Sequence, residues 1–123
     1  MIDHVSIAVR DFAAAVAFYD GVLAAFGYAR LETRDATAGW GKKYPEFWVN
    51  WRSGAAAASD GTHISFRARS RELVDAFYDA ALAAGGTSDG APGLRPHHGE
   101  GYYAAFIRDP EGNKLEAVTF VQP

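Results

Sequence analysis

The sequence predicts an α+β fold built from two copies of one strand–helix–strands unit. The first observation is an internal repeat: residues 4–27 align without a gap with residues 63–86, at a constant offset of 59 residues. The second is a change of apolar spacing within each copy, from every second residue, as in a strand, to every third or fourth, as in a helix. The third is a set of short strand-like segments after each helix. The repeat therefore indicates two modules related by a pseudo-twofold axis.

Chemically informative residues recur at matching positions of the repeat. His4 aligns with His63, Ser6 with Ser65, and the triplet Phe-Tyr-Asp at 18–20 with the same triplet at 77–79. Any side chain that points toward the pseudo-twofold axis is therefore expected there twice.

The first module begins with a strand over residues 2–9, in which His4 faces away from the helix layer because successive side chains alternate between faces. Asp11 is a favourable N-cap for a helix over residues 12–26, and Gly27 suits the position after that helix.

The remainder of the first module contains two predicted strands. Residues 28–34 and 45–52 have strand-like composition, whereas residues 35–43 are polar and contain glycine, which favours a hairpin or a loose loop. Three side chains of the later strand face away from the helix: Glu46, Trp48 and Asn50.

The second module repeats this order. Residues 62–69 form the first strand, with His63 and Arg67 facing away from the helices, and Ser70 caps the helix that follows. Residues 87–101 are rich in glycine, proline and histidine and are predicted to form a long loop.

Two further strands close the chain, at residues 102–108 and 113–121, with a tight turn between them. Glu116 lies between Leu115 and Ala117 in the last of these apolar strands. A buried carboxylate is costly unless it is paired or bound to a metal, so Glu116 is expected to have a partner.

Length and patterning together favour one domain over residues 1–123, with module one at 1–52, a connector at 53–61 and module two at 62–123. The connector contains four consecutive alanines flanked by glycine and polar residues.

The composition excludes several classes of function. The net charge is −3 and the basic residues are scattered, which argues against nucleic acid as a partner. The absence of cysteine excludes disulfides, thiolate metal sites and cysteine nucleophiles. The sequence contains neither a signal-peptide pattern nor an apolar run of about 20 residues. We therefore expect a soluble cytoplasmic protein that does not bind membranes.

Two histidines and two carboxylates form the main candidate site. His4 and His63 lie near the start of each module's first strand, and Glu46 and Glu116 lie on the last strands. Imidazole nitrogen and carboxylate oxygen together suit a divalent transition metal. A single histidine on a strand is more often only hydrogen-bonded, and Glu46 follows a proline at a strand end, where it is equally well explained as a solvated side chain.

Five further residues are candidates for substrate binding: Trp48, Asn50, Arg67, His98 and Tyr103. Arg67 suits an anionic group, and His98 lies in a loop of the kind that can close over a site. The alternatives are a salt bridge for Arg67, solvent exposure for His98 and core packing for the aromatic residues.

Three motifs resemble the vicinal oxygen chelate superfamily, which includes glyoxalase I, fosfomycin and bleomycin resistance proteins and extradiol dioxygenases. They are H-V-S-I-A-V-R-D with F-Y-D seven residues later, T-H-I-S-F, and D-P-E-G-N-K-L-E-A-V near the end. The resemblance implies two tandem β-α-β-β-β modules whose mixed sheets curl into a cup-shaped barrel around one divalent metal, with the helices outside. Matching positions would place the metal ligands at His4, His63 and Glu116, with a fourth at Glu46.

This resemblance implies a metal-dependent lyase or isomerase of the glyoxalase type, which acts on a small substrate chelated through adjacent oxygens. The metal would be zinc, nickel, iron or manganese, and Glu116 or Glu46 would serve as the catalytic base. Two alternatives stay open: a metal-free binding protein of the bleomycin-resistance type, and a small iron-dependent extradiol dioxygenase. Because members of this superfamily often pair, we also expect a homodimer, with the cup built within one chain or across two.

Overall fold

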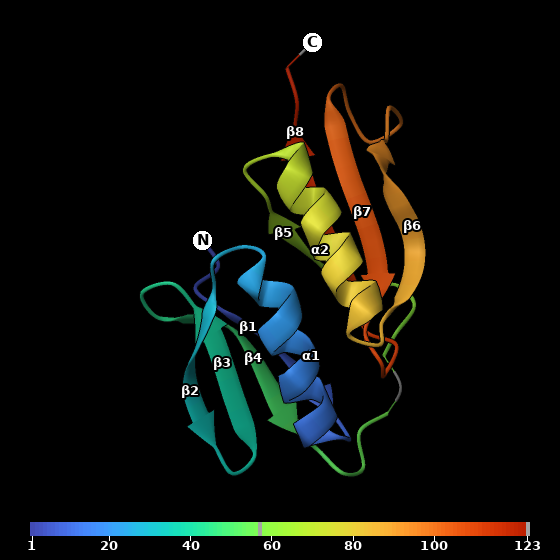
Figure 1. Ribbon diagram of the computed structural model, residues 1–123. Helices are drawn as coiled ribbons and strands as arrows, with labels where there is room; N and C mark the ends of the chain where they lie inside the picture. The colour runs from blue at the N-terminus through green and yellow to red at the C-terminus, as the bar shows by residue number, and fades with distance from the viewer. Residues whose placement is uncertain (57, 123) are drawn as a thin grey trace.

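A computed structural model describes residues 1–56 and 58–122 of the 123-residue chain. The expected connector 53–61 and module two at 62–123 each contain one residue outside this description. Figure 1 shows two modules side by side, each with one helix over one face of its own sheet. The prediction of an α+β fold with two β-α-β-β-β modules is therefore confirmed.

The two modules have the same order of elements. Module one contains β1 (Val5–Val9), α1 (Phe12–Ala24), β2 (Ala29–Arg34), β3 (Thr37–Gly41) and β4 (Pro45–Trp51). Module two contains β5 (His63–Arg67), α2 (Arg71–Ala83), β6 (Thr87–Leu94), β7 (Tyr102–Arg108) and β8 (Lys114–Phe120).

Each module forms a four-stranded mixed sheet. The strand order is β1-β4-β3-β2 in module one and β5-β8-β7-β6 in module two. The first strand of each module pairs with its last strand in parallel, and the other pairs are antiparallel. In the described part of the chain the two sheets stay separate and do not close into a barrel. We call the face of each sheet that turns away from the helices its open face.

The hairpin expected at residues 35–43 is present, because a two-residue turn joins β2 to an antiparallel partner strand. The loose-loop option does not hold, since most of this segment is strand β3. Its sequence, Thr-Ala-Gly-Trp-Gly, has little intrinsic preference for a strand. Pairing decides its conformation, because β3 lies between β2 and β4, and both Ala38 and Trp40 are fully buried.

Strand β6 replaces most of the long loop expected at residues 87–101. It contains two glycines and a proline, and its register with β7 shifts twice. Such residues are tolerated because β6 is the edge strand of its sheet, where Pro92 need not donate to a further strand.

Both helices begin at the expected caps. The Asp11 side chain accepts a hydrogen bond from the N–H of Ala14 at 3.1 Å, and the Ser70 hydroxyl accepts one from the N–H of Leu73 at 3.2 Å. Gly27 follows α1 with φ of 76°, a conformation that glycine adopts without strain. Neither helix in the described residues is long and apolar enough to cross a membrane.

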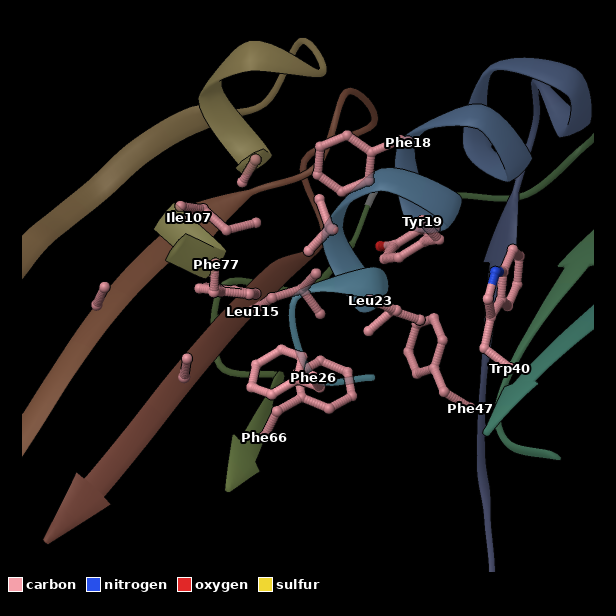
Figure 2. Close-up of a cluster of buried hydrophobic side chains, with 14 of the residues drawn as sticks. Phe18, Tyr19, Leu23, Phe26, Trp40, Phe47, Phe66, Phe77, Ile107 and Leu115 are labelled. Atoms are coloured by element: carbon pink, nitrogen blue, oxygen red, sulfur yellow. The ribbon is translucent and has the colours of Figure 1, made fainter. Parts of the chain in front are cut away.

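One aromatic core joins the two modules, as Figure 2 shows. The Phe26 ring of module one lies 5.6 Å, centroid to centroid, from both Phe66 and Phe77 of module two. Phe47 of β4 lies 5.5 Å from Phe66. Helices α1 and α2 also contact each other. The sheets are therefore separate, but the hydrophobic core is shared.

The turn between β7 and β8 ties module two to helix α1. The buried Tyr19 hydroxyl donates to the Asp109 carboxylate at 2.6 Å. The Glu111 carboxylate accepts hydrogen bonds from the N–H groups of Arg10, at 2.7 Å, and Asp11, at 2.8 Å, just before α1 begins. A turn of one module thus completes the N-terminal cap of the other module's helix.

Candidate functional site

The strand alternation expected from the sequence places the candidate residues of β5 and β8 on one open face. His63, Ser65 and Arg67 are exposed, whereas Phe66 between them is buried in the core. Parallel pairing of β5 with β8 then sets Ser65 opposite Glu116. His63 and Glu116 are therefore neighbours on the open face of module two.

Glu116 is the buried acid of this site. Its side chain is only 2% exposed, and its Oε1 lies 3.1 Å from Nε2 of His63. The Tyr102 hydroxyl donates to Oε2 of the same carboxylate. The expectation that Glu116 has partners is met by one imidazole and one phenol.

The Tyr102 hydroxyl keeps its proton and so remains a hydrogen-bond donor to Glu116. Burial, followed by the hydrogen bond to the Glu116 carboxylate and its negative charge, raises the pKa of Tyr102 to about 12. Tyr102 is therefore protonated at neutral pH and orients Glu116. The His98 ring lies 5.2 Å from the Tyr102 ring, so this predicted residue also belongs to the neighbourhood of Glu116.

These side chains line a cavity of about 310 Å³, which we call the module-two cavity. Its wall also includes Asp89 and Arg95 from the β6 side, Phe106 from β7 and Lys114 from β8. The cavity therefore combines metal-binding residue types with fixed positive charge.

Module one has its own open-face cavity of about 590 Å³, lined by His4, Trp48 and Asn50. The His4 Nδ1 lies 2.7 Å from the carboxylate of Asp3. Asn50 accepts a hydrogen bond from the Thr37 hydroxyl at 2.5 Å. We call this the module-one cavity.

Trp48 of the module-one cavity packs against β3. Gly39 lies directly across the β3–β4 ladder, and a Cβ atom there would lie 2.8 Å from the indole ring. Glycine thus lets the indole lie flat on the sheet. The Arg34 guanidinium lies 6.0 Å from the indole centroid.

Glu46, His4 and His63 border a third cavity, of about 340 Å³, at the junction of the modules. The side chains of these three residues are too far apart to form a metal site. Among the described residues, no group of three histidine or acidic side chains could hold a metal ion. Of the four predicted ligands, the described part of the chain brings together His63 and Glu116.

The donor chemistry of this pair fits a divalent metal. Metal–ligand distances of about 2.0–2.2 Å place neighbouring ligand atoms about 2.8–3.6 Å apart, depending on the coordination geometry, and the observed separation, which is that of a hydrogen bond, is 3.1 Å. The pair supplies two protein ligands, which is fewer than the roughly three that catalytic zinc sites use. The pair is therefore one part of a possible ligand set.

Two predicted substrate-binding residues lie outside both open-face cavities. Tyr103 turns to the helix side, where its hydroxyl donates to Asp75 of α2 at 2.7 Å and the Arg71 guanidinium lies 4.5 Å from its ring. Arg67 lies on the open face, where its guanidinium is 4.7 Å from the ring of Phe120.

Several residues of the module-two cavity were not among the predicted site residues, and they include Tyr102, Arg95 and Lys114. For Lys114, alternation with Glu116 was an available signal, because residues two apart on a strand share a face. For Arg95 there was none, since its position follows from the irregular register of β6.

Comparison with known proteins identifies the family of this chain. The profile of the Glyoxalase/Bleomycin resistance protein/Dioxygenase superfamily matches residues 1–117. The chain belongs to this superfamily. Divalent metals are often used within the glyoxalase/bleomycin resistance/dioxygenase superfamily, and the His63–Glu116 pair is compatible with that use.

Solved structures of the superfamily share the fold. A glyoxalase/bleomycin resistance protein from Albidiferax ferrireducens is 30% identical, with a TM-score of 0.84 over 94% of this chain and 95% of that one. A glyoxalase/bleomycin resistance protein/dioxygenase family enzyme from Burkholderia phytofirmans is 24% identical, with a TM-score of 0.78 over 98% of both chains. A search of curated proteins found no match.

Proposed function

We propose that this protein is a metal-dependent enzyme of the glyoxalase type, a lyase or isomerase that acts on a small substrate through adjacent oxygens. The observation that carries the proposal is the buried Glu116 carboxylate beside His63 at the wall of an open cavity. Burial of a carboxylate is costly, and a position beside an imidazole and a solvent-accessible space is typical of a functional acid.

The proposed ligand set is His63 and Glu116 together with His4 and Glu46. The metal would be zinc, nickel, iron or manganese, all of which accept imidazole and carboxylate ligands. When bound, such an ion polarises substrate oxygens as a Lewis acid.

The other roles in the proposed reaction belong to side chains of the protein. Glu116 or Glu46 serves as the base, and the Tyr102 hydroxyl orients Glu116. Trp48 and Asn50 bind the substrate from the module-one cavity, and His98 binds it from the module-two side. For Arg67 and Tyr103 a substrate-binding role stays a prediction, since Arg67 contacts Phe120 and Tyr103 contacts Asp75.

We further propose that the active protein is a homodimer. Each open-face cavity of one chain holds part of the ligand set, with His4 in module one and the His63–Glu116 pair in module two. Pairing of module one of one copy with module two of another would complete the set twice, as a twofold symmetric assembly requires.

The test is the metal content of the purified, untagged protein. We expect about one divalent metal per chain, consistent with a single catalytic site, and loss of that metal in His63→Ala and in Glu116→Ala. His97→Ala is the matched control, because it removes a histidine from the same cavity that is not assigned to the metal. Unchanged metal content in His63→Ala would contradict the proposal.

One observation favours a second candidate, a metal-free binding protein: the described residues of one chain contain no group of three suitable ligands. In that case wild-type protein would stay metal-free after reconstitution with zinc, nickel, iron and manganese. Selective retention of iron would instead favour the dioxygenase alternative, which needs two histidines and one carboxylate.

A further inference from the structure

The basic side chains around the module-two cavity outnumber the carboxylates that can pair with them. Lys114 Nζ lies 3.2 Å and Arg108 Nε 3.5 Å from the same oxygen of Asp89. The other carboxylate, Glu116, is engaged by His63 and Tyr102. One acid, Asp89, therefore compensates two cations.

Arg95 adds a third cation, which is positioned but not neutralised. Its Nη2 donates to the carbonyl oxygen of Ala91 at 2.6 Å. Across the described residues, no carboxylate lies within 4.0 Å of its guanidinium. A guanidinium that donates only to neutral carbonyls keeps its full charge and most of its fork of donors for a ligand.

Two glycines make room for this guanidinium. A Cβ atom at Gly93 would lie 3.0 Å from Nη1 of Arg95, and one at Gly90 would lie 3.2 Å from Nη2. The guanidinium thus lies close against the backbone of β6. Its place depends on the absence of side chains there.

Arg95 and Lys114 line the same cavity, and both lie near the ring of Phe106. The Arg95 guanidinium carbon lies 5.6 Å and the Lys114 ammonium 5.1 Å from the centroid of this ring. Both distances are within the range of cation–π attraction. Like charges held around one ring repel each other, and an oxyanion bound between them would relieve that repulsion.

We propose that Arg95 and Lys114 form an oxyanion-binding subsite in the module-two cavity, which holds the carboxylate, phosphonate or phosphate group of a small organic anion. The inference rests on the proposed function only in identifying this anion as the substrate. Binding of the oxyanion itself requires no metal.

The experiment uses the full chain after treatment with EDTA, with backbone amide signals followed by NMR. The probes are inorganic phosphate, benzoate and benzamide, the last being a neutral match of benzoate. We expect phosphate, benzoate or both to shift the signals of Gly90, Gly93 and Phe106, and benzamide to leave them unchanged. A response to only one anion identifies the oxyanion class.

Arg95→Gln should weaken anion binding about 10-fold or more, as expected for the loss of charge-assisted hydrogen bonds. Arg30→Gln is the matched control, because Arg30 lies in module one and is paired with Asp20. Gly93→Ala keeps every charge but shifts the Arg95 guanidinium by a few tenths of an ångström, so it should weaken binding less than Arg95→Gln does. Unshifted module-one signals would report intact folding in each variant.

Two results would overturn the subsite: anion binding unchanged in Arg95→Gln, or benzamide binding as well as benzoate. Failure of the proposed function is distinguishable from these. If the wild-type protein takes up no metal yet binds phosphate in a way that depends on Arg95, the enzyme proposal fails and the oxyanion subsite stands.

Discussion

At the scale of single residues, the two copies of the repeat use the same tyrosine differently. Tyr19 and its counterpart Tyr78 occupy equivalent positions of α1 and α2. Only Tyr19 is fully buried with its hydroxyl on a carboxylate, that of Asp109. Burial and then the charge of Asp109 raise the pKa of Tyr19 well above its usual value, which keeps the hydroxyl protonated as a donor.

Tyr19→Phe should lower the free energy of unfolding by about 1–3 kcal/mol, because the buried Asp109 loses one of its donors. Tyr78→Phe is the control, and we expect a change of no more than about 0.5 kcal/mol. In the described part of the chain the Tyr78 hydroxyl has no hydrogen-bond partner. Urea unfolding followed by circular dichroism measures both values, and equal losses in the two variants would contradict this assignment.

Residue positions could be predicted from the sequence where strand alternation alone decides them. His63 and Glu116 fall on one open face because each follows the period of two. Alternation could not decide between Tyr102 and Tyr103, since two adjacent tyrosines suit either face of a strand. The structure turns Tyr102 to Glu116 and Tyr103 to Asp75.

At the scale of elements, the turn between β7 and β8 has a structural role that the motif alone did not indicate. The turn is the D-P-E-G-N part of the third family motif, and its two acids both contact module one. Asp109 accepts from Tyr19, and Glu111 accepts from the N–H groups before α1. This turn therefore holds the start of α1 in place.

Glu111 predicts a dependence of stability on pH. Burial raises the pKa of Glu111, but hydrogen bonds from the N–H groups of Asp11 and Arg10 and from the Arg10 side chain outweigh burial, so the pKa lies below 4.5. Because the folded pKa is lower than the unfolded one, the stabilisation is complete above about pH 4.5 and is lost as the pH falls through the folded value.

Glu111→Gln should therefore lower the free energy of unfolding by about 1 kcal/mol at pH 7, the scale of a helix cap with a favourable charge. The difference from wild type should shrink steadily below about pH 4.5. Glu100→Gln, at an exposed site, serves as the control and should show neither effect. A difference that stays constant down to acid pH would argue that the charge of Glu111 is not involved.

Elements with clear periodicity were predictable, and elements defined by pairing were not. The two helices, their caps and strand β7 follow from local patterns. Glycine or proline occupies two of the five positions of β3 and three of the eight positions of β6, and these strands extend only because a neighbouring strand pairs with them. Their existence thus depends on contacts that a local pattern does not contain.

At the scale of the whole molecule, the two open-face cavities belong to different modules, each with part of the proposed ligand set. Shared packing of Phe26, Phe47, Phe66 and Phe77 fixes the modules relative to each other. The internal repeat predicted two related modules, but not that their sheets would stay separate, because that depends on packing between residues far apart in the chain.

A mixing experiment tests whether the metal site spans two chains. His4→Ala and His63→Ala homodimers should each bind metal weakly. A mixed dimer should regain one intact site, with His4 from one chain and His63 from the other, if the assembly is symmetric. Co-expression with two different tags, followed by metal analysis of the doubly purified dimer, measures this. No recovery in the mixed dimer would contradict a metal site shared between two chains.

The aromatic core shared by the two modules has a consequence for the origin of the chain. Module one alone would expose Phe26 and Phe47, and module two alone would expose Phe66 and Phe77. Each half needs a partner that covers these rings, and the gapless alignment of residues 4–27 with residues 63–86 shows that the two halves are related in sequence. A half-length ancestor would have had to cover the apolar face of its own core by self-association. Gene duplication and fusion would then have made that association permanent, leaving each copy free to diverge.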